Sequence, residues 1–241
     1  MIILFTDFGT TDPYIGQMKA VFAQLVPHEQ IIDLFHHVPN YEITAGAYLL
    51  PAYVKEFPIG SIFVCVVDPG VGGKREAIVA KLDGQWFVGP DNGLLDVLAQ
   101  RSTNVEWWHI NSDPNIVSAS FHGRDIFAPI ASQISQSDLS ALVSWRESKQ
   151  LASMPEDVAR IIYVDHYGNI ISGYRFENIT DTGELFFKGK KISQARTFSD
   201  VLPNQAFYYK NANGLLEIAV NQGSAEEMFD AKVGDRFSFI E

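Results

Sequence analysis

The sequence predicts an α/β fold over residues 1–150, followed by a small β domain over residues 155–241. In the first part, short apolar runs alternate with segments of helical periodicity, which is typical of a mostly parallel sheet with helices on both faces. A polar stretch then covers residues 148–157. Beyond it, short strands follow one another with Gly and Asn turns and little helical pattern, which indicates an antiparallel arrangement.

The hydrophobic pattern places the elements of the first domain. Strands are expected at 2–6, 30–35, 61–67, 77–82, 85–88 and 105–110. A first helix is expected between Asp12-Pro13, an N-cap followed by proline at the first helical position, and Pro27. Further helices are expected at 43–57, with a kink at Pro51, at 94–101 and at 125–134. The run 61–67 is apolar throughout, as in strands buried on both faces.

In the second domain, the strands are expected at 160–164, 169–174, 184–187, 206–209, 215–220 and 236–240. Each run is short and bounded by turn residues, and no internal repeat links them.

Composition excludes several classes of protein. The 241 residues carry a formal net charge of −11, which disfavours a nucleic-acid partner. The single cysteine, Cys65, lies in an apolar run and is expected to be a buried strand residue rather than a nucleophile. No apolar run approaches the roughly 18 residues of a membrane span, and the N-terminus is typical of a strand rather than a signal peptide. We therefore expect a cytoplasmic protein without a membrane partner.

Three polar, glycine-containing loops, 6–12, 68–75 and 120–125, are expected at the edge of the sheet where α/β proteins bind ligands. Asp68 ends a buried strand, and Arg75 lies seven residues further on, so the two can pair. With His122 they form a set that can hold and orient a water molecule. A plain salt bridge and a structural histidine are the alternatives.

Other polar residues also allow two interpretations. Asp7 is either a turn residue or a carboxylate that accepts hydrogen bonds from a vicinal diol such as ribose. Asp165 and Asn169 flank a Gly turn, and their carboxylate and amide can also contact a ligand. His36 and His37 point to opposite faces if both lie on a strand, so no metal site is expected.

Five segments carry a family resemblance: 6–12 (TDFGTTD), 67–72 (VDPGVG), 89–93 (GPDNG), 121–129 (FHGRDIFAP) and 165–169 (DHYGN). Together, and in this order, they resemble the S-adenosyl-L-methionine (SAM) hydrolases. This family is also called the SAM hydroxide adenosyltransferases, and it is related to the SAM-dependent fluorinase and chlorinase. The resemblance covers nearly the whole chain.

The resemblance implies an N-terminal α/β domain, a β-barrel-like C-terminal domain and a homotrimer with active sites between neighbouring subunits. It implies hydrolysis of SAM to adenosine and L-methionine by attack of an activated water on ribose C5′. No cofactor is expected, because the sulfonium is already a good leaving group.

The resemblance also assigns residues. Asp68, Arg75 and His122 match the catalytic set, and the substrate-binding positions are Asp7 (ribose hydroxyls), Tyr41 (nucleoside), Asp165 (methionine amine), Tyr167 and Asn169 (adenine), and Ala212, Val220 and Gln222 (further methionine and adenine contacts). Ala212 departs from the serine of the halogenating relatives, which leaves only a backbone contact there.

Three other functions compete with hydrolysis. The halogenases carry tyrosine at the position of Asp68 and serine near Gly123, and a carboxylate would repel a halide in a dry pocket. A metal-dependent nucleotide phosphatase built on the Asp7 loop would need a divalent cation. A non-catalytic adenosine-binding module would share the nucleoside contacts without turnover.

Overall fold

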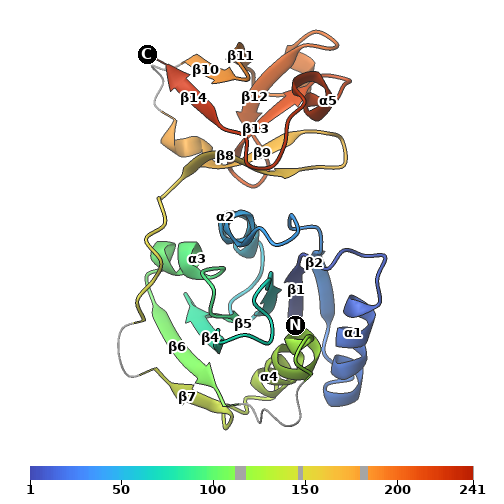
Figure 1. Ribbon diagram of the computed structural model, residues 1–241, viewed down its shortest axis with the longest axis vertical. Coiled ribbons are helices and arrows are strands. Elements are labelled where there is room, and N and C mark those ends of the chain that lie inside the picture. The colour runs from blue at the N-terminus through green and yellow to red at the C-terminus, as the bar shows by residue number, and fades with distance from the viewer. Residues whose placement is uncertain (112–117, 146–148, 180–183, 241) are drawn as a thin grey trace. The chain divides into compact units, whose positions relative to one another are not determined.

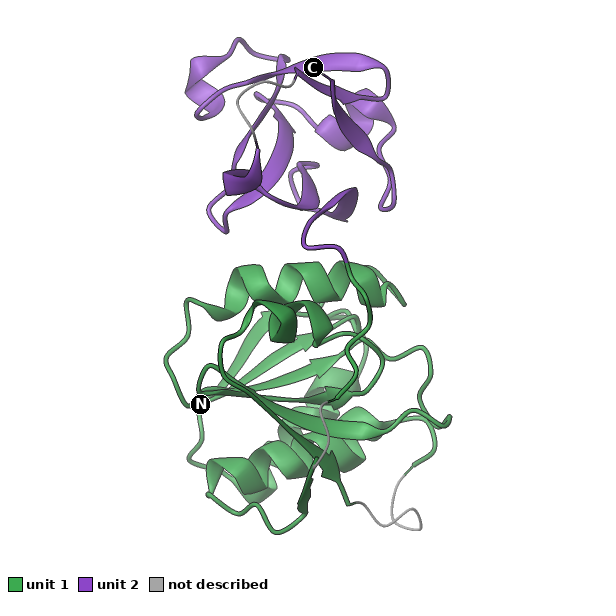
Figure 2. Cartoon of the chain, turned by 90° about the vertical axis from the view of Figure 1, so that its left-hand side faces the viewer, with its two compact units in different colours: residues 1–154 green, residues 155–241 purple. Residues whose placement is uncertain are grey.

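The computed structural model describes residues 1–111, 118–145, 149–179 and 184–240. The chain divides into two compact units, Met1–Met154 and Pro155–Glu241 (Figure 2). Each unit has its own sheet, and the described strands number seven in each.

The sheet of the first unit is mixed. Its strand order is β2-β1-β3-β5-β4-β6-β7. The strands are β1 (Ile2–Thr6), β2 (Ile31–Phe35), β3 (Ile62–Val66), β4 (Ala77–Leu82), β5 (Gln85–Pro90), β6 (Val105–Ile110) and β7 (Leu142–Ser144). The pairs β1–β2, β1–β3 and β3–β5 are parallel, whereas β4–β5, β4–β6 and β6–β7 are antiparallel.

The expectation of a mostly parallel sheet is therefore wrong, and the Asp83-Gly84 turn is the physical reason. Both residues have positive φ (46° and 88°), as a two-residue hairpin turn requires. A parallel crossover needs a dozen or more residues, so two residues between β4 and β5 allow only an antiparallel pair.

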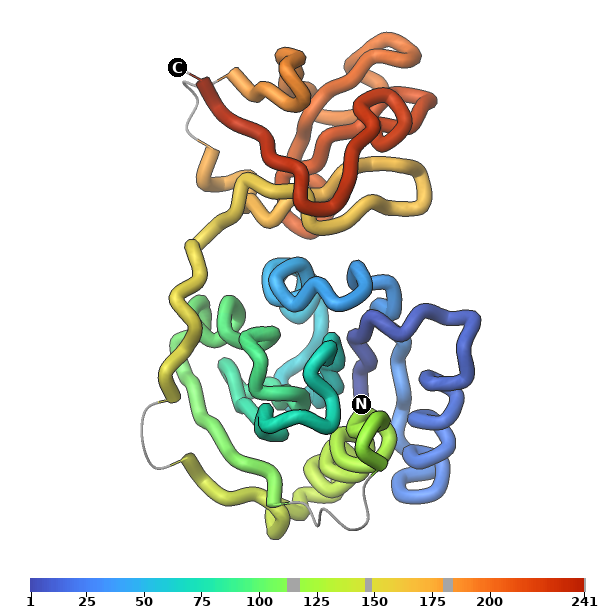
Figure 3. Tube along the Cα trace, in the orientation of Figure 1, coloured from blue at the N-terminus to red at the C-terminus, as the bar shows by residue number. Residues whose placement is uncertain are grey.

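Helices cover both faces of this sheet (Figure 1). Helices α1 (Tyr14–Leu25) and α4 (Ala128–Ser135) lie side by side on one face, although more than 100 residues separate them along the trace (Figure 3). Helices α2 (Ile43–Val54) and α3 (Asp96–Arg101) lie on the other face. Alternate residues of the buried strands serve the two sides: Leu4 joins the core under α1 and α4, and Phe5 contacts Tyr53 of α2.

Several helix boundaries differ from the sequence expectation: α2 ends at Val54 instead of 57, and α3 begins at Asp96 instead of 94. Asp12 does not cap α1, because the N-cap position is Pro13 and no side chain accepts a hydrogen bond there. The helix expected at 125–134 begins earlier, as a π-helix at Gly123–Phe127 that runs into α4. His122 is the N-cap residue of this π-helix, directly before the first turn.

The second unit carries a nearly barrel-shaped sheet of order β14-β10-β11-β12-β13-β9-β8. Its elements are β8 (Val158–Val164), β9 (Ile170–Arg175), β10 (Glu184–Phe187), β11 (Lys190–Gln194), β12 (Ala206–Lys210), β13 (Leu215–Val220), β14 (Phe237–Ile240) and helix α5 (Ala225–Phe229). A bridge between Arg160 and Arg236 links the two ends of the sheet. The sheet is not purely antiparallel as expected, because β11, a strand that the sequence analysis missed, pairs with β12 in parallel.

Within the described part of the chain, no helix combines the length and the apolar character that crossing a membrane requires.

Candidate active site

Asp7 lies at the carboxyl end of β1, in the interior of the first sheet. Its backbone N–H donates to the carbonyl of Val66, at the end of the neighbouring strand β3 (3.3 Å). Its Oδ2 accepts from the backbone N–H of Tyr41 (3.0 Å), a residue with left-handed φ of 66°. Burial raises the pKa of Asp7, and the negative charge of Asp68 acts in the same direction. A carboxylate accepts several hydrogen bonds, so Asp7 can also accept from ligand hydroxyls.

A cavity of about 380 Å³, here called the Asp7 cavity, opens beside this carboxylate. Its lining residues are Asp7, Phe8, Asp12, Tyr14, Asn40, Tyr41, Asp68, Ser120 and Phe121. Phe8, Tyr14 and Phe121 form an aromatic cluster with ring centroids 5.5–5.9 Å apart. The cavity thus joins three predicted site residues, Asp7, Tyr41 and Asp68, and an apolar wall suited to a nucleoside.

Asp68, Arg75 and His122 form one hydrogen-bonded set. The Nε of Arg75 lies 3.1 Å from both carboxylate oxygens of Asp68, and Nη2 lies 2.5 Å from Oδ2. The same Nη2 lies 2.6 Å from the Nδ1 of His122. The Asp68 and Arg75 side chains are only 3% and 11% exposed, so this is a largely desolvated ion pair. The pairing of Asp68 with Arg75 agrees with the sequence expectation.

The contact with Arg75 fixes the protonation of His122. A guanidinium nitrogen only donates hydrogen bonds, so Nδ1 must accept, and the ring is neutral with its proton on Nε2. Burial lowers the pKa of His122, and the positive charge of Arg75 lowers it further. His122 therefore offers an N–H donor from Nε2, while Asp68 supplies the negative charge of the set.

The three residues face two cavities. Asp68 lines the Asp7 cavity, whereas Arg75 and His122 line a second cavity of about 480 Å³, here called the His122 cavity. Its other lining residues are Glu76, Ala77, His109, Ile110, Asn111, Ile126 and Val143. The hydrogen-bonded set is therefore a wall shared by both cavities.

Gly72 explains how the loops carrying Asp68 and His122 come so close. Its φ is 75°, and a Cβ at this position would lie 2.2 Å from the backbone oxygen of Ala119. Only glycine allows this approach of the two backbones. Gly72 thus serves the packing of the two loops.

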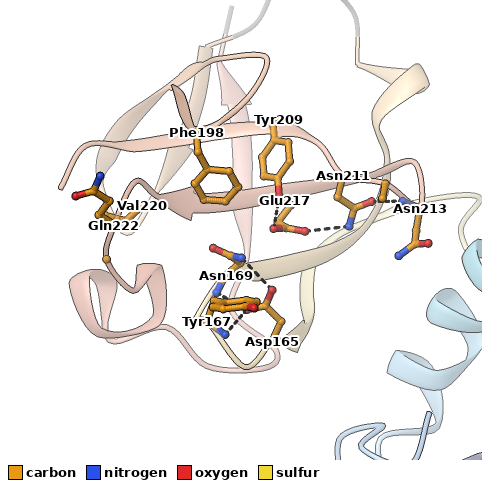
Figure 4. A pocket seen from close by; sticks show the side chains of 12 residues that line it. Asp165, Tyr167, Asn169, Phe198, Tyr209, Asn211, Asn213, Glu217, Val220 and Gln222 are labelled. Atoms are coloured by element: carbon orange, nitrogen blue, oxygen red, sulfur yellow. Dashed lines mark hydrogen bonds between the residues drawn. The ribbon is translucent and has the colours of Figure 1, made fainter. Parts of the chain in front are cut away.

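The second unit holds a third cavity, of about 590 Å³, here called the C-terminal cavity (Figure 4). All six predicted binding residues of this unit line it: Asp165, Tyr167, Asn169, Ala212, Val220 and Gln222. Asp165 also orders its own loop. Its Oδ1 accepts from the backbone N–H groups of Tyr167 and Asn169, and its Oδ2 accepts from the Asn169 side chain, each at 2.9 Å.

The sequence analysis did not single out three other residues that line the C-terminal cavity: Phe198, Tyr209 and Glu217, the last of which lies within the segment 211–222 that the resemblance assigns to substrate contacts. Phe198 and Tyr209 contact each other, with ring centroids 5.6 Å apart. Nothing in the local sequence distinguishes them from core aromatics. The sequence does distinguish Glu217, because an acidic residue inside the apolar strand Leu215–Val220 is costly to bury and indicates a functional position.

His36 has a structural role. Its Nδ1 bonds the hydroxyl of Thr6 (2.9 Å), and its Nε2 lies 3.1 Å from Asp33. The Thr6 hydroxyl in turn accepts from the backbone N–H of Phe8 (3.2 Å), so His36 supports the loop of Asp7. Across the described residues, no three His, Cys, Asp or Glu side chains gather as a metal-binding group.

Comparison with known proteins identifies the class to which this two-unit architecture belongs. Residues 2–143 match the N-terminal domain, and residues 159–238 the C-terminal domain, of the SAM hydroxide adenosyltransferase model. The chain belongs to the SAM hydroxide adenosyltransferase family.

Individual relatives agree with this assignment. The chain is 33% identical to a protein from Salinispora tropica named (R)-S-adenosyl-L-methionine hydrolase, over 96% of this chain and 94% of that protein. It superimposes with a TM-score of 0.88 and 31% identity on the crystal structure of an uncharacterized conserved protein from Thermotoga maritima, with full coverage of both chains. A fluorinase from Actinopolyspora mzabensis is more distant, at 21% identity over 97% of this chain and 95% of that protein.

Proposed function

We propose that this protein hydrolyses S-adenosyl-L-methionine to adenosine and L-methionine. The observation that carries the proposal is the contact set of Asp68, Arg75 and His122 at the wall of the Asp7 cavity. Family membership and the hydrolase relative support the same reaction.

The reaction is a displacement at ribose C5′. The oxygen of a water molecule bonds to C5′ while the C5′–S bond breaks, and the electron pair of that bond passes to sulfur. The sulfonium thereby becomes the neutral thioether of methionine, and the water loses one proton, which is released to solvent. Because the leaving group is neutral, no metal or cofactor is required for its departure. Orienting the water in line with the C–S bond contributes roughly 7–11 kcal/mol.

The three side chains of the set have different roles in the reaction. Asp68, paired with Arg75, accepts a hydrogen bond from the water and favours hydroxide character. The Nε2–H of His122 donates, and Arg75 holds both partners in place. Asp7 binds the ribose hydroxyls and Tyr41 contacts the nucleoside.

In the second unit, Tyr167 and Asn169 bind adenine, Asp165 binds the methionine amine, and Ala212, Val220 and Gln222 complete the contacts.

We further propose a cytoplasmic homotrimer with active sites between neighbouring subunits. The predicted substrate contacts are divided between two cavities, the Asp7 cavity of the first unit and the C-terminal cavity of the second. This division supports the arrangement. Tyr41 and Tyr167, one at each cavity, are 73% and 75% exposed and available for burial against a neighbouring subunit. Light scattering coupled to size exclusion measures the assembly, and a stable monomer that turns over SAM would contradict it.

A turnover assay tests the function. Purified protein is incubated with SAM, with and without chelator, and then with added chloride or fluoride, and the products are separated by chromatography. We expect adenosine and methionine in every case. A 5′-halogenated nucleoside would indicate a halogenase, which the carboxylate of Asp68 disfavours. Dependence on a divalent cation would favour the phosphatase, and binding without turnover would leave a nucleoside-binding module.

The neutral state of His122 leads to a pH prediction. Its ring resonances in NMR are expected to titrate below the ordinary histidine value of about 6.5, because burial and Arg75 both disfavour the imidazolium. The active neutral form then persists into mildly acidic solution and is lost as the pH falls through the lowered pKa. In Arg75→Met the midpoint is expected to rise, since the positive charge is lost while the negative charges of Asp68 and Asp125 remain nearby. A midpoint that does not move contradicts the proposed contact.

A further inference from the structure

Glu217 is a buried carboxylate on the wall of the C-terminal cavity. It lies in β13, whose six residues are all buried, and it is 5% exposed itself. Figure 4 shows its carboxylate pointing between Tyr209 and Asn211, on the opposite side of the cavity from Asp165. Burying an ionisable group in a strand is costly, so its presence at a cavity wall calls for a partner.

The hydrogen bonds around Glu217 suit the ionised form, in which both carboxylate oxygens accept. The hydroxyl of Tyr209 donates to Oε1 (2.6 Å), and Nδ2 of Asn211 donates to Oε2 (3.1 Å). Asn211 cannot turn its amide around, because its Oδ1 already accepts from the backbone N–H groups of Asn213 (3.0 Å) and Leu215 (2.9 Å). Both oxygens of Glu217 therefore act as acceptors, as those of a carboxylate do.

No protein cation offsets this charge within the cavity. Its lining residues include two acids, Asp165 and Glu217, and none of these described residues is Lys, Arg or His. Burial raises the pKa of Glu217, and the negative charge of Asp165 acts in the same direction. The cavity thus has a negative potential that a bound positive group would relieve.

We propose that Glu217 is a second carboxylate, facing Asp165, for the α-ammonium group of the substrate. This inference rests on the proposed function and adds a specificity-determining residue to it. Each carboxylate oxygen has a further lone pair beyond the bond it accepts from Tyr209 or Asn211, and an ammonium has three N–H donors to share between the two acids. Glu217 then makes the cavity select nucleosides that carry an amino-acid side chain over those without one.

Glu217→Gln tests this with little change of shape. The glutamine oxygen can accept from Asn211, and its amide can donate to the Tyr209 oxygen, so both bonds persist while the charge is lost. Calorimetry compares two unreactive ligands: S-adenosyl-L-homocysteine, which has the ammonium but no sulfonium charge, and adenosine, which has neither. We expect about a 10- to 100-fold loss of affinity for the first, the range of a charged hydrogen bond, and wild-type affinity for adenosine. For SAM, KM is expected to rise more than kcat falls.

The matched control is Glu226→Gln, which removes one negative charge from an exposed position on α5 outside the cavity. Glu226→Gln is expected to bind both ligands as the wild type does. An equal loss for both ligands in Glu217→Gln, no loss for either, or a loss confined to SAM would overturn the ammonium assignment.

If Glu217→Gln does not fold, a second variant tests the proposal. Glu217→Asp keeps the charge but withdraws it by one methylene. Reduced affinity for S-adenosyl-L-homocysteine with unchanged adenosine binding supports the proposal, and wild-type affinity for both overturns it. Failure of the proposed function is recognised separately, because the wild type would then release no adenosine from SAM.

Discussion

Replacing His122 by alanine is expected to reduce adenosine release from SAM by about 10²- to 10⁴-fold, the usual contribution of one positioned proton donor or acceptor. The change removes the Nε2–H donor and leaves the Nη2 of Arg75 without its partner at 2.6 Å. Chromatography of the products measures turnover, and calorimetry with adenosine measures binding. Adenosine binding is expected to survive, because the nucleoside contacts proposed for Asp7 and Tyr41 do not involve His122.

His109→Ala is the matched control for this experiment. His109 lines the same His122 cavity, but it contacts Glu76 and stacks on Trp145 instead of joining the Asp68 set. It is expected to turn SAM over at nearly the wild-type rate. Wild-type turnover by His122→Ala would remove His122 from the catalytic set, and equal losses in both variants would point to a general disturbance of the cavity.

The positions of Asp7, Asp68 and His122 could be predicted from sequence because each adjoins a recognisable element. Asp7 and Asp68 end apolar strands, and the carboxyl ends of neighbouring parallel strands meet at one edge of a sheet. His122 precedes a helix that packs on the same sheet. The direct contact between Arg75 and His122 could not be predicted, because it depends on the backbone approach at Gly72, which is a tertiary feature.

The errors have equally local causes. The Asp83-Gly84 pair between two apolar runs is a strong hairpin signal. It indicates an antiparallel pair and therefore a mixed sheet. Asp12 is a residue type that favours N-cap positions, but Pro13 occupies the N-cap of α1 and Asp12 lines the Asp7 cavity. Tyr209 and Glu217 meet only because β12 and β13 pair in register, Tyr209 opposite Glu217. Pairing of this kind is not visible in either strand alone.

The ion pair of Asp68 and Arg75 gives the largest expected effect on stability. Arg75→Met leaves the nearly buried carboxylate of Asp68 without its counter-charge, and the free energy of unfolding is expected to fall by about 3–5 kcal/mol. The double variant Asp68→Asn/Arg75→Met removes the unpaired charge and is expected to recover most of this loss, because the two side chains are in direct contact. Urea unfolding of the two single variants and the double variant completes the cycle.

Activity separates a structural from a catalytic pair in the same set of proteins. If the pair only stabilised the loops, the double variant would regain turnover together with stability. We expect the double variant to be stable and inactive, because neither the negative charge of Asp68 nor the guanidinium that holds His122 remains. Arg75→Lys provides the intermediate case, because it keeps the charge but lacks the planar guanidinium that contacts both Asp68 oxygens and His122 at once. We therefore expect this variant to lose less stability than activity.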